Sequence, residues 1–134
     1  MATGVQVTFD CADPGRLAEF WAEALGYVLQ PPPEGHDSWP AFLTAIGVPE
    51  SEWNTRSAVV DPDGRGPRLF FQRVPEPKAV KNRVHLDVNV GKDGVDAAVE
   101  RLVAKGATRV EEVGQLGERW VVMADPEGNE FCLQ

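Results

Sequence analysis

Apolar and polar residues alternate along residues 5–11, as expected of a strand with one buried face. The pattern then changes to a helical period, with Asp13 placed as the N-cap, Pro14 at the first helical position and Gly26 as the terminus. The residues predicted to face inward from this helix are Leu17, Phe20, Trp21, Ala24 and Leu25.

The second half of the chain repeats this pattern. A strand is predicted over residues 83–90, and a second helix is predicted between Asp93 as its N-cap and Gly106 as its terminus. A turn at residues 61–64 has a counterpart at residues 125–128, and an apolar strand follows each turn. The inward residues of the second helix are predicted to be Val95, Ala98, Val99, Leu102 and Val103. This similarity indicates an internal duplication.

Each copy therefore has the element order β-α-β-β-β. The predicted fold class is α+β, with the duplicated modules forming a curved mixed eight-stranded sheet that carries its helices on the convex side. Residues 31–56 have no counterpart in the second copy and form an insertion with a short helix predicted around 40–47. The chain is interpreted as a single domain over 1–134, with the first module, the connector and the second module at about residues 4–74, 75–82 and 83–134.

Composition narrows the possible functions. The chain has 134 residues, and its formal net charge of −8 argues against nucleic acid as a partner, because phosphates require a basic surface. No apolar run approaches the roughly 20 residues of a membrane-spanning helix. Cys11 and Cys132 make no disulfide framework, and we expect a cytoplasmic location.

Four sequence motifs carry a family resemblance. They are DP at residues 13–14, FW at 20–21, VHLDV at 84–88 and DPEGN at 125–129. In this order and spacing the chain resembles the vicinal oxygen chelate superfamily (the glyoxalase/bleomycin-resistance/dioxygenase fold), and within it the glyoxalase-like domain branch. The resemblance extends over essentially the whole chain and implies a homodimer. It also implies, for those members that are enzymes, a divalent metal on the concave face that binds two neighbouring oxygens of the substrate.

The resemblance implies one metal ligand on the first and last strand of each module. Carried over to this chain, the four positions are Gln6, Phe70 or Gln72 depending on register, His85, and Cys132, where the family normally has glutamate. Glu130 lies on the same strand face, two residues before the cysteine. Because the usual carboxylates are missing, no firmly held metal is implied. The candidate ligands are Gln6, His85 and Cys132, which suit zinc or iron better than nickel or manganese.

The first functional hypothesis is that the protein binds a small organic molecule in the concave groove, as in the bleomycin-resistance branch, where sequestration is the activity. Two alternatives stay open: a divalent-metal-dependent lyase, isomerase or dioxygenase using His85, and a metal-free enzyme with His85 and Glu130 as an acid–base pair. The predicted polar contacts are Gln6, Gln72, His85, Asp87 and Glu130, and the predicted apolar walls are Phe70, Trp39, Trp53 and Trp120.

Overall fold

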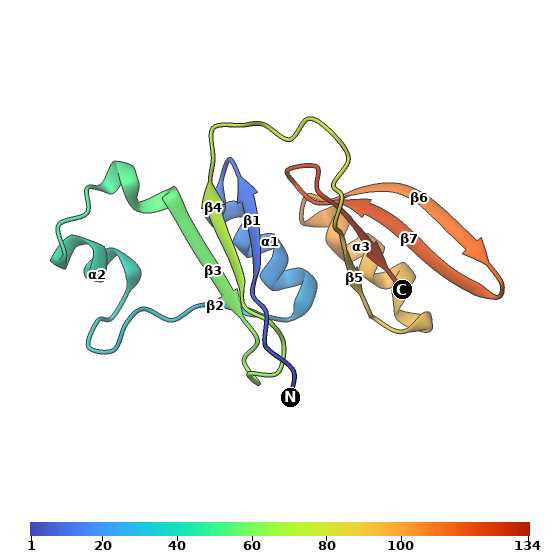
Figure 1. Ribbon diagram of the computed structural model, residues 1–134, viewed down its shortest axis with the longest axis horizontal. Coiled ribbons are helices and arrows are strands. Elements are labelled where there is room, and N and C mark those ends of the chain that lie inside the picture. Colours follow the sequence, from blue (N-terminus) through green and yellow to red (C-terminus); the bar gives the residue numbers. More distant parts are fainter.

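The computed structural model describes all 134 residues, and its strands form two sheets with the same topology. The first sheet has the strand order β1-β4-β3-β2, and the second has the order β5-β8-β7-β6. In each sheet the first and last strands of the module are parallel, whereas all other neighbours are antiparallel. The duplicated α+β fold is therefore confirmed, and its eight strands form two four-stranded mixed sheets that lie next to each other (Figure 1).

The elements have the following bounds. The strands are β1 (Val7–Cys11), β2 (Val28–Leu29), β3 (Arg56–Val60), β4 (Leu69–Arg73), β5 (Leu86–Val88), β6 (Thr108–Gln115), β7 (Glu118–Ala124) and β8 (Glu130–Leu133). The helices are α1 (Pro14–Leu25), α2 (Trp39–Ala45) and α3 (Val95–Ala104), with 3₁₀ turns η1 (Glu50–Thr55) and η2 (Lys92–Gly94). The domain boundaries predicted from sequence stay a prediction.

Helix α1 forms as its sequence predicts. The side chain of Asp13 accepts a hydrogen bond from the backbone N–H of Arg16 at 3.2 Å, and Pro14 occupies the first turn. Gly26 ends the helix with φ of 70°, a left-handed conformation that glycine adopts without steric cost. The predicted inward residues are buried, except that Leu25 is only half-buried.

The start of α3 differs from the prediction. Asp93 lies inside η2, and the residue before the helix is Gly94, which provides no side-chain cap. The reason is that Gly91, with φ of 84°, turns the chain into one 3₁₀ turn before α-helical geometry begins. The inward prediction for Val103 is also wrong, because this side chain is 45% exposed. The strand predicted over 83–90 is shorter in the structure, where only β5 (Leu86–Val88) has strand geometry. Its single partner is the short strand β8.

Aromatic rings join the two modules through a common core. The indole of Trp21 on α1 lies 5.1 Å from the ring of Phe9 and 5.0 Å from the ring of Phe131, measured between centroids. Phe9 and Trp21 belong to the first module, whereas Phe131 belongs to β8 of the second. The rings meet in tilted and edge-to-face arrangements, which are favourable beyond their burial alone.

Two carboxylates of the second module also bind groups of the first. Asp125 accepts a hydrogen bond from the indole N–H of Trp21 at 3.0 Å. Glu127 accepts hydrogen bonds from the backbone N–H groups of Ala12 and Asp13, at 2.7 and 2.9 Å, in the turn between β1 and α1. The turn that precedes β8 therefore fixes the position of β1 and α1 relative to the second sheet.

Asp125 is the one buried acidic residue of the chain, with 3% of its surface exposed. Burial raises the pKa of its carboxyl group, while hydrogen bonds from Asn129, Trp21 and the backbone N–H of Glu127 act in the opposite direction. A buried carboxylate without these donors is costly, so each donor matters for the stability of the fold.

We expect Trp21→Phe to lower the free energy of unfolding by about 1–3 kcal/mol at neutral pH, because a buried carboxylate loses a donor and the smaller phenyl ring fills less of the core. Urea unfolding followed by circular dichroism measures this change. Trp120→Phe is the matched control, since the indole N–H of Trp120 donates no hydrogen bond within the protein. Equal destabilisation by the two substitutions would contradict the role given to the Trp21–Asp125 hydrogen bond.

Candidate functional site

A groove of about 940 Å³ lies between the two modules. Its walls come from β1 and the turn after it, from the connector between the modules, from the residues leading into β5, and from the turn before β8. We call it the seam groove. It contains two of the site residues predicted from sequence, His85 and Glu130, together with Thr8, Asp10 and Lys78. Both modules therefore contribute to one cavity.

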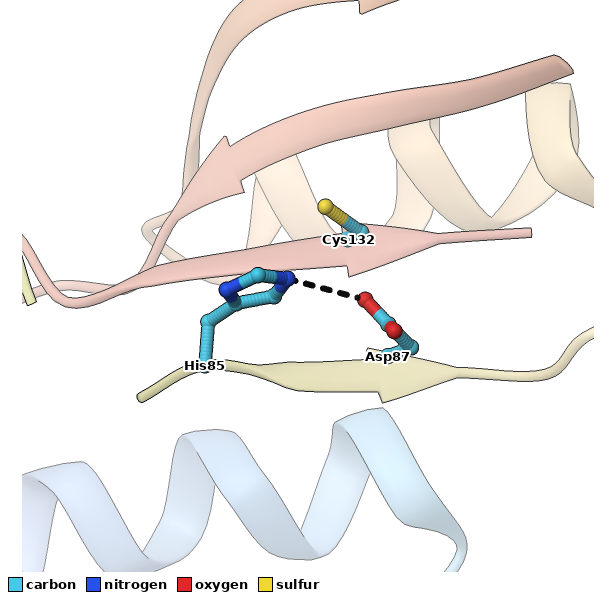
Figure 2. Close-up of side chains that lie close together, drawn as sticks. All are labelled: His85, Asp87 and Cys132. Atoms are coloured by element: carbon cyan, nitrogen blue, oxygen red, sulfur yellow. Dashed lines mark ion pairs between the residues drawn. The ribbon is translucent and has the colours of Figure 1, made fainter. Parts of the chain in front are cut away.

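Three side chains with metal-ligating or acid–base groups meet beside this groove. His85 immediately precedes β5, Asp87 lies within β5, and Cys132 is its direct partner across the ladder on β8. Since alternate residues of a strand share a face, His85 and Asp87 point to the same side, and Cys132 points with them (Figure 2). His85 Nε2 lies 3.3 Å from Asp87 Oδ1, and one ligand atom from each of the three residues lies within 4.8 Å of the others.

The environment of this triad affects the charge of the thiol. Burial raises the pKa of Cys132, and the negative charge of Asp87 and a hydrogen bond with it act in the same direction. The thiol is therefore protonated at neutral pH, and a bound cation would be needed to convert it to thiolate. The imidazole and the carboxylate are both solvent-accessible, with 42% and 47% of their side-chain surface exposed.

Glu130 is engaged by the connector. Its carboxylate forms an ion pair with Lys78 at 3.1 Å and accepts a hydrogen bond from the backbone N–H of Asn82 at 3.0 Å. Desolvation alone would raise the pKa of Glu130, but these hydrogen bonds and the ammonium charge together lower it to about 2. A carboxylate with so low a pKa is a weak base, and its evident role here is to hold the connector to β8. The acid–base pairing of Glu130 with His85 stays a prediction.

The two predicted glutamines belong to hydrogen-bond pairs on the first sheet. Gln6 accepts a hydrogen bond from Arg68 at 2.9 Å, and Gln72 donates one to Asp10 at 2.7 Å. Neither glutamine lines the seam groove. By strand register the first-module position equivalent to Cys132 is Phe70 and not Gln72, because Phe70 pairs with Thr8 as Cys132 pairs with Asp87 in the second module. A ligand role for either residue stays a prediction.

The predicted aromatic walls lie elsewhere. Trp39, Trp53 and Phe70 line a second cavity of about 670 Å³, which is formed between the first sheet and the insertion. We call it the insertion pocket. Trp120 is half-buried on β7 and lines neither cavity. The structure thus separates the predicted residues into a polar site at the seam and an aromatic site under the insertion.

Sequence analysis missed two features of these sites. Lys78 belongs to no motif, since nothing near it in the sequence indicates that Glu130, 52 residues away, is its partner. Arg56 and Arg68, which line the insertion pocket, had no recognisable motif. Arg56 was placed at the end of the insertion, and Arg68 precedes the apolar strand that follows the turn at residues 61–64.

The triad offers a nitrogen, an oxygen and a sulfur donor. This set suits a tetrahedral zinc or an iron(II) ion with three protein ligands and one open position, and it suits manganese or magnesium less well. Donor atoms around tetrahedral zinc lie roughly 3–4 Å apart. The observed separations of up to 4.8 Å therefore require a small inward movement of the side chains. His85 and Asp87 are free to make it, because both are exposed.

The family of the chain follows from a comparison with protein-family models. Residues 6–134 match the model of the glyoxalase-like domain, and the chain belongs to this family. No curated protein matches the chain.

Solved structures share the fold at low sequence identity. A mutant of the fosfomycin resistance protein FosX from Listeria monocytogenes, complexed with Mn(II) and 1S,2S-dihydroxypropylphosphonic acid, is 13% identical with a TM-score of 0.70, over 100% of this chain and 90% of that one. A glyoxalase/bleomycin resistance protein/dioxygenase family enzyme from Burkholderia phytofirmans PsJN is 18% identical with a TM-score of 0.63, over 96% and 94%. A glyoxalase-related enzyme from Fulvimarina pelagi is 17% identical with a TM-score of 0.67, over 99% and 87%.

The predictions of a homodimer and a cytoplasmic location stay predictions. As to membranes, none of the helices combines the length and the apolar character needed to cross one.

We expect the free energy of unfolding of the Glu130→Gln variant to depend less on pH in the acid range than that of the parent protein. The folded-state pKa of about 2 lies below the ordinary value of 4.5, so the contribution of Glu130 is complete above pH 4.5 and is lost as the pH falls towards 2. The variant should be less stable than the parent by about 1–2 kcal/mol at neutral pH, and this difference should shrink in acid.

Chemical unfolding at a series of pH values measures this effect. Glu76→Gln is the control, because Glu76 also lines the groove but makes no ion pair. A constant difference between the Glu130 variant and the parent at all pH values would show that the ion pair with Lys78 does not lower the pKa of Glu130.

Proposed function

We propose that the protein binds a small organic molecule in the seam groove, with His85 as the group that contacts the ligand. The observation that carries this proposal is the His85–Asp87 pair, whose imidazole lines a cavity built by both modules. The groove volume of about 940 Å³ lies in the range of small-molecule sites, which is roughly 300–1,000 Å³.

The geometry of the pair supports a proton-accepting role for His85. Its Nε2 faces Asp87 at 3.3 Å, and a carboxylate next to one ring nitrogen favours the proton on that nitrogen. Nδ1 is then left with a lone pair that can accept a hydrogen bond, or a proton, from a bound molecule. Asp87 orients the ring and stabilises the imidazolium if that proton is taken up.

The charges around the groove favour a neutral or cationic ligand. Most of its carboxylates already have partners: Glu127 binds backbone N–H groups, Glu130 binds Lys78, and Asp10 binds Gln72. Five carboxylates line the groove against two cations, which are Arg16 and the Lys78 that is paired with Glu130. Sequestration of such a ligand, as in the bleomycin-resistance branch, needs no further chemical group.

A second candidate function is a divalent-metal-dependent lyase, isomerase or dioxygenase, and the triad of His85, Asp87 and Cys132 favours it. These three residues would hold the ion, and the ion when bound would act as a Lewis acid towards two neighbouring oxygens of a ligand. Asp87 takes the place proposed from sequence for Gln6, whose side chain is engaged by Arg68. The remaining residues of the groove would bind and orient the organic molecule.

We expect the small-molecule proposal to be testable with a fragment mixture and ligand-observed NMR. Fragments that bind the parent protein should lose binding in His85→Ala, and they should keep it in His36→Ala. The two histidines are the only ones in the chain, and His36 packs against Phe42 outside the groove. Retention of every binding fragment by the His85 variant would refute the proposal for this groove.

We expect cobalt(II), used as a spectroscopic substitute for zinc, to give a thiolate-to-cobalt charge-transfer band if the triad holds a metal. The band should disappear in Cys132→Ser and weaken in Asp87→Asn. Cys11→Ser is the matched control. Cys11 is also buried, and burial followed by the charge of Glu127 raises the pKa of its thiol to about 12, but Cys11 lies on β1 and is not one of the three clustered residues. A band that survives in Cys132→Ser, or no band at millimolar cobalt at pH 8, would overturn the metal-site candidate.

A further inference from the structure

Four aromatic side chains contribute to the lining of the insertion pocket. Trp39 and Phe42 come from α2, Trp53 comes from η1, and Phe70 forms the floor on β4. The pocket shares no lining residue with the seam groove. It is therefore a separate cavity, and its properties do not depend on the function proposed for His85.

The two tryptophans are held in place by hydrogen bonds. The indole N–H of Trp39 donates to the carbonyl of Gln30 at 2.7 Å, and that of Trp53 donates to the carbonyl of Val48 at 3.0 Å. Asn54, next to Trp53, accepts a hydrogen bond from the backbone N–H of Gly15 at 2.8 Å and so ties η1 to the start of α1. The ring faces are thus fixed before any ligand arrives, which lowers the entropy cost of binding.

The pocket also contains a cation that has only neutral partners. The guanidinium of Arg68 lies 5.1 Å from the centroid of the Phe70 ring, a cation–π geometry. Its Nε donates to Gln30 Oε1 at 2.6 Å and its Nη1 donates to Gln6 Oε1 at 2.9 Å. No carboxylate lies within ion-pair distance of Arg68. Nη2 has no partner in the protein and is available to a ligand.

Arg56, at the start of β3, adds a second positive charge to the same lining. It is exposed and likewise makes no ion pair. Glu52 is the one acidic residue of the lining, and it pairs with neither arginine. Ion pairs engage only five of the 13 basic residues of the chain, so what distinguishes Arg56 and Arg68 is their place together in the lining of one cavity.

From these contacts we propose that the insertion pocket binds a small organic anion with a flat apolar body, of the aromatic carboxylate class. The aromatic walls would cover the body of the ligand, and the volume of about 670 Å³ is sufficient for one or two fused rings. The planar guanidinium of Arg68 matches the two oxygens of a carboxylate, and Arg56 adds attraction at the entrance. This ligand class is opposite in charge to the one the seam groove favours.

The test compares 2-naphthoate with 2-naphthamide, which has nearly the same shape but no charge. Isothermal titration calorimetry on the full chain should show saturable binding of the carboxylate and at least about tenfold weaker binding of the amide, since hydrogen bonds to a charged group are the stronger ones. This comparison needs no substitution, so it does not depend on whether a variant folds. Equal affinities, or no saturable binding of 2-naphthoate up to millimolar concentration, would overturn the proposal.

Substitutions of the two arginines test whether they bind the carboxylate of the ligand. Arg68→Gln should weaken 2-naphthoate binding by at least about tenfold, and Arg56→Gln should weaken it several-fold. Arg65→Gln is the matched control, because Arg65 lies outside the pocket and pairs with Asp63. Circular dichroism verifies that each variant is folded, and Arg56→Gln is the safer variant since Arg56 makes no side-chain hydrogen bond. Unchanged affinity in both pocket variants would refute the assignment of the anion to the arginines.

The four tryptophans of the chain report on the place of binding. In ¹⁵N-labelled protein the indole N–H signals of Trp39 and Trp53 should shift on addition of 2-naphthoate, whereas those of Trp21 and Trp120 should not, because neither of these lines the insertion pocket. Shifts confined to Trp21, which borders the seam groove, would place the ligand there and overturn the proposal.

Discussion

The contact between Trp21 and the turn before β8 is the interaction on which the rest of the structure depends. The two sheets share no hydrogen-bonded strand pair, so the modules are joined through side chains. Trp21 packs against Phe131 and donates to the buried Asp125, while Glu127 binds the turn after β1. These contacts set the distance between β1 and the residues leading into β5, and this distance creates the seam groove.

Duplication explains both the likeness and the difference between the modules. Asp61 and Asp125 organise equivalent turns by accepting backbone N–H groups, but only Asp125 is buried and reaches across to the other module. Hydrogen bonds lower the pKa of the half-buried Asp61, whereas burial raises the pKa of Asp125. The second turn therefore holds the domain together, and the first serves its own hairpin.

The same comparison shows why candidate chemistry lies in the second module. By register, the first-module positions equivalent to His85, Asp87 and Cys132 are Gln6, Thr8 and Phe70. No ionisable group occupies these positions in the first module. In the first module, residues of the sheet and of the insertion together line a pocket that contains aromatic side chains and two arginines. The two copies of one unit thus carry different side chains at equivalent positions.

Periodicity and turn chemistry are local properties, and the sequence alone determined what depends on them. The duplicated order of strands and helices, the capping of α1 by Asp13 and Gly26, and the shared face of His85 and Asp87 could all be predicted, because alternation and capping act over a few residues. The local pattern failed at Asp93, where Gly91 inserts a 3₁₀ turn before α3.

Only the tertiary structure decided which side chains from distant segments meet. The pairing of Lys78 with Glu130, the closeness of Cys132 to Asp87, and the position of the insertion over Phe70 depend on how the two modules and the insertion pack. No local pattern encodes these contacts, since each is made across tens of residues by the burial of a shared core.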